Sequence, residues 1–368
     1  MAKDQMLLVS TDAHSSTDDT LSELQPLITA VQRNCDIADA RHAQSMTLCT
    51  YLLEMREYFR WEQGIAPPQA PPRAALGRWI AAREALWNEL EDEDFARLPV
   101  AGNWFDPFAS GKINRQLIEQ GMVYGAGIGR FQRPQFFLGA LLQRELRDGV
   151  GILVAGREYA RDLSAAPAAL RQGTVYLRQD VVSRMLWEKV EAWDGQPKDG
   201  ALRRALAPHG FDADQGAAIA RMTETESEAL ILHELGEHQA GVLLGAEWEE
   251  MLAAFSDRRA EILCRAVRDL LADCRSTLPT LLARRAYGSL HFWFANFDGM
   301  RRALLPSLSD AYRLWCDGGD DAALAKQLAR GAAHWQEVAQ RLLALYQEDN
   351  RAGEATIAAL ADAKALAL

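Results

Sequence analysis

Residues 233–238 read His-Glu-Leu-Gly-Glu-His and lie in the middle of a long segment with helical periodicity. Each residue of an α-helix turns the chain by about 100°, so residues four apart lie on the same face. The pairs that share a face are therefore His233 with Glu237 and Glu234 with His238. Each pair combines an imidazole with a carboxylate, which makes this stretch the first candidate for a functional site.

The segment that contains this stretch, 217–255, is predicted to be one buried helix because apolar side chains surround its axis. Four small residues, Gly236, Ala240, Gly241 and Gly245, would let a neighbouring element approach closely. Charged groups buried in such a place must be paired or must bind a metal ion. The sequence leaves both possibilities open. The arginines that could pair with these groups are Arg258, Arg259, Arg284 and Arg285.

The stretch resembles the H-E-x-x-H helix of zinc metalloproteases over about six residues, but its spacing differs. Here the two histidines are five residues apart, so they diverge by about 140° around the helix. It also resembles the Glu-x-x-His pattern of carboxylate-bridged dimetal proteins, since Glu234 and Glu237 are three apart. His238 comes one residue too late for that pattern. Neither resemblance allows a ligand set to be transferred to this chain.

Six residues are predicted as metal ligands, two of which, Glu234 and Glu237, are also the predicted catalytic residues. The six are His233, Glu234, Glu237, His238, His42 and Glu261. Glu261 resembles the third ligand of gluzincin-type metalloproteases because it lies 23 residues after His238. Its charged neighbours nevertheless favour a solvated surface position. His42 lies beside an apolar stripe, where a hydrogen-bonded core histidine is the usual case. Further candidates are Glu226, Asp39 and His291.

Mixed imidazole and carboxylate ligands suit divalent Fe, Mn or Zn. The first hypothesis is a metal-dependent enzyme with a non-haem Fe or Mn centre that performs redox chemistry on a small-molecule substrate. The second is a zincin-like hydrolase in which a glutamate acts as general base on metal-bound water. The third is a scaffold or binding protein that contains buried ion pairs and no metal.

Composition narrows the class of protein. The chain has 368 residues and a formal net charge of −11, which argues against nucleic-acid and anionic-membrane partners. Five cysteines without a C-x-x-C pair disfavour a disulfide framework and a zinc ribbon. The N-terminus has too few apolar residues for a signal peptide, and no apolar run could span a membrane. We expect a cytoplasmic protein, with an Ala/Leu-rich C-terminal region that closes the bundle or forms a homo-oligomer contact.

The expected fold is a predominantly helical α+β structure. A long N-terminal helix is predicted from Pro26 to Trp61, followed by a proline-rich connector. The predicted strands are 122–128, 135–146, 150–157 and 174–178, which would form a small, largely antiparallel sheet. The predicted regions are 1–63 (long helix), 64–73 (connector), 74–200 (α+β) and 201–368 (helical, with the metal site).

The glycines of Gly125-Ala-Gly-Ile-Gly129 suggest a phosphate-binding loop, but the pattern does not fit one. No helix is predicted after it, and the G-x-G-x-x-G spacing would require glycine at Arg130. Glycines inside a strand instead indicate a bulge or a place where another group approaches the backbone closely.

Overall fold

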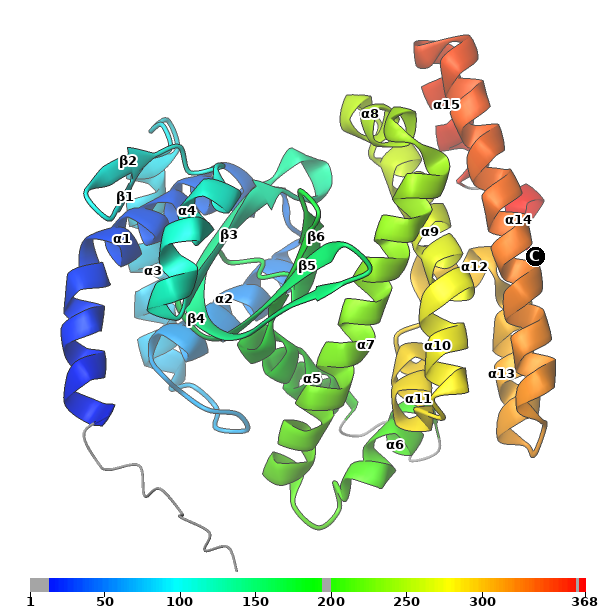
Figure 1. Ribbon diagram of the computed structural model, residues 1–368, viewed down its shortest axis with the longest axis horizontal. Coiled ribbons are helices and arrows are strands. Elements are labelled where there is room, and N and C mark those ends of the chain that lie inside the picture. Colours follow the sequence, from blue (N-terminus) through cyan, green and yellow to red (C-terminus); the bar gives the residue numbers. More distant parts are fainter. Residues whose placement is uncertain (1–12, 194–199, 362–363) are drawn as a thin grey trace, which may run out of the picture.

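The structure is a computed structural model that describes residues 13–193, 200–361 and 364–368. The fold is a predominantly helical α+β structure, as predicted. Helix α7 (Gln215–Leu244) runs between a part of the molecule that contains a sheet and a part made of helices alone (Figure 1). No described helix has the length and apolar character needed to cross a bilayer.

The N-terminal helices differ from the prediction. The helix expected to run without a break from Pro26 to Trp61 is two helices, α1 (Ala13–His42) and α2 (Leu48–Glu62), so that expectation was wrong. The break has a local cause. Ser45 Oγ donates to the carbonyl of His42 at 2.8 Å, and Thr47 Oγ1 accepts from the backbone N–H of Thr50 at the start of α2. Such side-chain bonds compete with the helix and favour a new N-cap. Helix α3 (Arg73–Leu90) follows the connector.

Two sheets occur in the described residues. β1 (Leu98–Val100) and β2 (Asn103–Phe105) form a short hairpin, and helix α4 (Ser110–Leu117) follows it. The larger sheet has the order β3-β4-β5-β7-β6, in which only the β5–β7 pairing is parallel. Its strands are β3 (Met122–Ile128), β4 (Pro134–Arg147), β5 (Val150–Arg161), β6 (Ala168–Arg171) and β7 (Thr174–Arg178). The four predicted strands are confirmed, whereas the edge strand β6 was not predicted.

The sheet packs against helices from both halves of the chain. Residues of β3 and β4, including Tyr124 and Phe136, share a core with α1. Residues of β5 and β7, including Ile152 and Leu177, share a core with α5 (Gln179–Trp193) and with Ile231 and Leu235 of α7. Helix α7 therefore presents one side to the sheet, and it carries residues 233–238 to the end of β6.

The rest of the chain is a helical bundle. The predicted helix 217–255 is interrupted at Gly245, whose φ is +85°, so α7 is followed by a separate α8 (Ala246–Ala254). The helices before and after them are α6 (Ala201–Leu206), α9 (Arg258–Ala272), α10 (Leu278–Ala283), α11 (Tyr287–Ala295), α12 (Gly299–Leu304), α13 (Pro306–Cys316), α14 (Asp321–Glu348) and α15 (Asn350–Leu360). A π-helical turn, η5 (Asp273–Thr277), joins α9 to α10.

The close approach predicted at Gly236 is confirmed, whereas the one predicted at Gly241 is wrong, because a Cβ there would meet open space. A Cβ atom at Gly236 would lie 3.1 Å from the carbonyl oxygen of Ala272 at the end of α9. Because α7 and η5 meet at Gly236 without an intervening side chain, the residues one turn away on each element can form hydrogen bonds with one another. This contact positions the candidate site.

Candidate functional site

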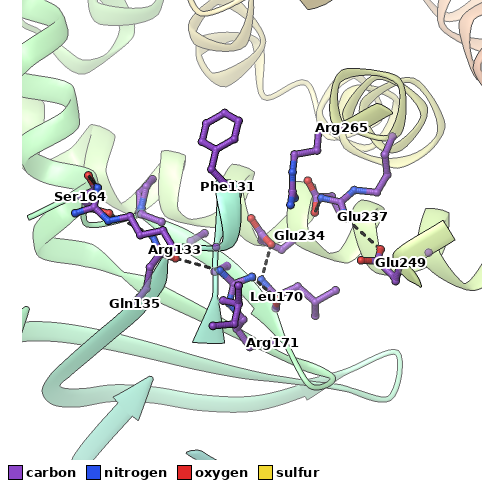
Figure 2. A pocket seen from close by; sticks show the side chains of 18 of the residues that line it. Phe131, Arg133, Gln135, Ser164, Leu170, Arg171, Glu234, Glu237, Glu249 and Arg265 are labelled. Carbon is purple, nitrogen blue, oxygen red and sulfur yellow. Dashed lines mark hydrogen bonds and ion pairs between the residues drawn. The ribbon is translucent and has the colours of Figure 1, made fainter. Parts of the chain in front are cut away.

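The four polar residues of the 233–238 stretch are distributed over two environments. His233 and Glu237 are turned toward α9 and η5, where they lie close to Asp269 and Asp273. Glu234, Glu237 and His238 line a cavity of about 1210 Å³ between the end of the sheet and α7–α9. Glu237 belongs to both environments. Figure 2 shows Glu234, Glu237 and Arg265 on the helical side, with Arg133, Gln135 and Arg171 on the sheet side.

His233, Glu237 and Asp269 form a compact group of potential metal ligands. One ligand atom from each residue lies within 4.8 Å of the other two. His233 Nε2 and Glu237 Oε1 are 3.4 Å apart. The other ring nitrogen of His233, Nδ1, lies 2.8 Å from Oδ1 of Asp273, a carboxylate with no exposed surface. The imidazole is therefore oriented, with Nε2 toward the group.

The protonation of this group follows from its neighbours. Burial alone would lower the pKa of His233, but Asp273 and Glu237 outweigh burial and raise it well above its usual value. Burial and the nearby Glu237 raise the pKa of Asp269 to about 6. The pKa of Glu237 is lowered, since Arg268 and His233 outweigh its burial. The carboxyl group of Glu237 is therefore a stronger acid than that of Asp269, and the imidazole of His233 is readily protonated.

An arginine also contacts this group. Arg268 of α9 donates to Glu237 Oε2 at 2.7 Å and to Glu249 of α8 at 3.2 Å. The arginine that reaches the stretch is thus Arg268, rather than one of the four considered from the sequence. Arg284 instead pairs with Glu228. Glu237 offers one oxygen to Arg268 and the other to His233.

Glu234 faces the cavity and joins α7 to the sheet. Its Oε2 accepts from the backbone N–H of Leu170 in β6 at 2.7 Å. Burial and then the nearby Glu237 raise the pKa of Glu234 to about 7. Its partner expected from helical spacing, His238, is half-buried and lines the same cavity. At neutral pH Glu234 can both take up and release a proton.

The two ligands predicted from outside the stretch lie apart from it: His42 lines the cavity, whereas Glu261 lies beneath the β3–β4 turn. His42, at the end of α1, lines the opposite wall of the cavity, and burial and Arg133 lower its pKa. Glu261 is only 6 % exposed, so its predicted place on a solvated surface is wrong. It accepts from Arg265 Nε at 2.8 Å and from the backbone N–H of Phe131 at 3.2 Å, because the β3–β4 turn covers it. Within the described residues, neither joins His233, Glu237 and Asp269.

Asp269, which belongs to the group, and Asp273, which contacts His233, were not among the ligands predicted from the sequence. Asp269 and Asp273 are four residues apart, so they lie one turn from each other along α9 and η5. That spacing is visible in the sequence. Their distance from His233, however, follows only from the contact between α7 and η5.

The glycines of β3 explain part of the cavity wall, and the predicted close approach to the backbone is confirmed. A Cβ at Gly127 would lie 2.6 Å from Cδ of Arg171, and one at Gly129 would lie 2.8 Å from Oε1 of Gln135. The glycines therefore leave room for Arg171 and Gln135 to lie over the strand. Arg171 Nη2 donates to Gln135 Oε1 at 3.1 Å.

Comparison with known proteins gives a family but no activity. No curated protein and no solved structure matches the chain. Residues 26–178 match the N-terminal domain of a family of unknown function, DUF6866, and residues 183–364 match the C-terminal domain of the same family. The division between them falls at the start of α5, so the cavity lies between the two domains. Since both domains are present in order and together span most of its length, this chain belongs to the DUF6866 family.

Proposed function

We propose that this protein is a metal-dependent enzyme that holds a divalent ion with His233, Glu237 and Asp269 and acts on a small molecule in the adjoining cavity. A non-haem Fe or Mn centre with redox chemistry is the first candidate, because one imidazole and two carboxylates suit these ions. Helices α7 and α9 supply all three ligands.

The distance between His233 and Glu237 carries this proposal. N–H···O hydrogen bonds usually span about 2.7–3.2 Å, and the 3.4 Å between Nε2 and Oε1 exceeds that range. Two atoms that are each about 2.1 Å from a tetrahedrally coordinated ion are about 3.4 Å apart. The spacing is therefore long for a direct hydrogen bond and fits two ligands of one ion.

The surroundings of His233 support the same proposal. Histidines that bind metals usually donate their other ring N–H to a carboxylate or carbonyl, which fixes the ring and its tautomer. Asp273 would play this part here, and it is held in turn by Arg301 at 3.4 Å. Asp273 also begins a π-helical turn, a feature that is frequent at functional sites.

Glu234 supplies the observation that favours a second candidate, a metal-dependent hydrolase. Its pKa of about 7 is close to the value at which a general base works best near neutral pH. It lines the cavity beside Glu237 and would be able to accept a proton from a nucleophilic water. Glu237, as a ligand, would not be available for that step.

The metal content of the purified protein tests the proposal. We expect near-stoichiometric Fe, Mn or Zn in the wild type by elemental analysis, and its loss in His233→Ala and Asp269→Asn. Asp310→Asn, which removes an exposed carboxylate paired with Arg313, is the matched control and should keep the metal. An optical or EPR signal that responds to oxygen would select the redox candidate, and a colourless zinc protein would select the hydrolase.

A wild-type protein that stays metal-free after purification with added Fe, Mn and Zn would overturn the proposal. The pairs His233–Asp273 and Glu237–Arg268 would then be a buried ion-pair network that joins α7 to α9 and η5. The contact of Arg268 with Glu237 is the observation that supports this metal-free alternative.

We further propose a cytoplasmic location. All five cysteines are free thiols, which suits a reducing compartment. Separation of cell fractions followed by detection of the tagged protein tests this, and a periplasmic or secreted protein would contradict it.

A further inference from the structure

We propose that the cavity between the sheet and α7–α9 binds a small molecule through an oxyanion, either phosphate or carboxylate, and that Arg171 is its principal contact. This inference does not depend on the metal, since Arg171 lies on the sheet side of the cavity. It names the class of ligand for a cavity that lies between the two domains.

The cavity is large and unevenly charged. Its volume of about 1210 Å³ can hold a small organic molecule. Among the residues that the structure describes, five arginines and three glutamates line it, although the whole chain has a net charge of −11. The arginines are Arg133, Arg171, Arg258, Arg265 and Arg268. Guanidinium groups are thus concentrated at this cavity in a protein that is acidic as a whole, which suggests that the cavity binds a negatively charged group.

Three of the five arginines have carboxylate partners of their own. Arg133 pairs with Asp39 at 2.6 Å, and Arg265 pairs with Glu261 at 2.8 Å. Arg268 pairs with Glu237 and Glu249. These guanidinium groups are neutralised locally, so they contribute shape and hydrogen-bond donors more than net charge.

Arg171 differs because the acceptors it contacts are neutral. It donates to the carbonyl of Leu170 at 3.3 Å and to Oε1 of Gln135 at 3.1 Å. Within the described residues it has no carboxylate at ion-pair distance. The nearby Glu234 carboxylate is bonded to the backbone N–H of Leu170 instead. Burial lowers the pKa of Arg171, which indicates that its charge is poorly compensated.

An oxyanion in the cavity would compensate this charge. A guanidinium carries five N–H donors in a planar fork that matches carboxylate and phosphate oxygens. Two of these donors are used by Leu170 and Gln135, which leaves others for a ligand. A partly desolvated charge without a counter-ion is unfavourable, so a bound anion gains more here than at an exposed arginine.

The chain holds Arg171 in place before any ligand binds. Because Gly127 has no Cβ, the stem of Arg171 can cross β3, and Gly129 does the same for Gln135. Gln135 in turn donates to the carbonyl of Ser164 at 3.4 Å. A side chain fixed in this way loses little conformational freedom on binding, which favours affinity.

The cavity also has a second arginine without a carboxylate partner among the described residues. Arg258, at the start of α9, lies over the ring of Phe131 at 4.5 Å. Phe131 and Gln132 both have φ near +56°, a strained conformation for residues other than glycine. Gln132 Nε2 donates to the carbonyl of Ala253, which ties the strained turn to α8. The turn thereby holds Arg258 at the cavity, where it can meet a second charge on the ligand.

Titration calorimetry with inorganic phosphate, succinate and glycerol tests the inference. We expect phosphate, succinate or both to bind to the wild type, and neutral glycerol not to bind. Arg171→Met keeps an unbranched apolar stem and removes the guanidinium group, so it should weaken binding by about tenfold or more. Arg313→Met is the matched control, because Arg313 is exposed on α13, and it should bind as the wild type does.

Asp269→Asn separates this inference from the proposed metal site. If it loses metal yet binds the anion as the wild type does, the anion site stands by itself. If the anion binds only to metal-loaded protein, or binds equally well to Arg171→Met, then Arg171 is not the contact and the inference is wrong. Failure of all three probes to bind to the wild type would also overturn it.

Folding of the variants is checked by thermal unfolding without ligand. Since Arg171 has no ion pair to lose, we expect Arg171→Met to unfold within a few degrees of the wild type. If it does not fold, Gly127→Ala replaces it, because the added Cβ would displace the stem of Arg171 without removing its charge. Weaker anion binding by a folded Gly127→Ala supports the inference, and unchanged binding contradicts it.

Discussion

At the scale of single residues, the carboxylates of the site differ in which donors and cations compensate their negative charge. Glu237 shares its two oxygens between His233 and Arg268, and Glu261 is covered by Arg265 and a backbone N–H. Among the residues that the structure describes, the carboxylate of Glu234 accepts a single hydrogen bond, from the backbone N–H of Leu170. Because burial favours its neutral form, the negative charge of Glu234 is costly near neutral pH.

This imbalance predicts a pH-dependent effect of Glu234→Gln. The pKa of Glu234 is raised to about 7 in the folded state, above the ordinary value of about 4.3 in the unfolded chain. A raised pKa contributes stability that is present below pH 4 and is lost as the pH rises through 7. Glutamine stays neutral and can still accept from Leu170 N–H. The variant should therefore be more stable than the wild type at pH 8, by on the order of 1–3 kcal/mol.

Urea unfolding of both proteins at pH 4 and pH 8 measures this difference. At pH 4, where Glu234 is protonated in the folded state and largely protonated in the unfolded chain, the two proteins should have nearly equal free energies of unfolding. A variant that is less stable than the wild type at pH 8 would show that the ionised carboxylate stabilises the fold, through Arg171 or a bound cation, and would contradict the assignment.

At the scale of elements, the contact of α7 with α9 and η5 assembles the group of ligands. Gly236 lies at this contact, whereas Gly241, five residues along the same helix, has open space where a Cβ would be. The two glycines therefore provide an internal comparison. They have the same intrinsic cost in a helix and differ in what surrounds them.

Alanine at each position should have different effects on stability. Gly241→Ala should stabilise the protein by about 0.5–1 kcal/mol, because alanine favours the helix and meets no neighbour. Gly236→Ala places a Cβ 3.1 Å from the carbonyl oxygen of Ala272, so this gain should be cancelled or reversed. Chemical denaturation measures both. Equal stabilisation by the two substitutions would mean that α7 and η5 can move apart without cost.

At the scale of the whole molecule, a few polar contacts connect the sheet to the helical bundle beside the cavity. Glu234 binds β6 through Leu170, and Glu261 binds the β3–β4 turn through Phe131. Farther along α7, Arg147 of β4 pairs with Glu228 at 2.8 Å. Each of these contacts joins a residue of the N-terminal family domain to a residue of the C-terminal one. Together they influence how firmly the two walls of the cavity are held against each other.

Replacing Glu261 should loosen this connection. Glu261→Ala removes the acceptor of the Phe131 N–H and leaves Arg265 without its carboxylate. We expect a loss of about 1–3 kcal/mol in the free energy of unfolding. We also expect faster hydrogen exchange at the amide of Phe131 than in the wild type. Glu224→Ala, an exposed position on α7, is the control and should change neither quantity. Unchanged exchange in Glu261→Ala would show that other contacts hold the turn.

Several elements could be predicted from the sequence because their signals are local. The runs 122–128 and 174–178, which turn residues separate from their neighbours, correctly predicted β3 and β7, and the glycines within 125–129 correctly indicated a close approach to the backbone. The break between α1 and α2 was missed, because Ser45 and Thr47 act through side-chain bonds that a periodicity pattern does not contain. The edge strand β6 is too short to show a clear alternation.

The sequence alone determined that His233 shares a helical face with Glu237, since that relation follows from the pitch of one helix. Only the tertiary structure decided that Asp269, Asp273 and Arg268 surround this pair, and that Arg171 faces the cavity without a carboxylate. These partners are separated along the chain and meet because α7 packs against η5 and the sheet. Packing of this kind depends on the summed shape of many side chains, and no short pattern of residues records it.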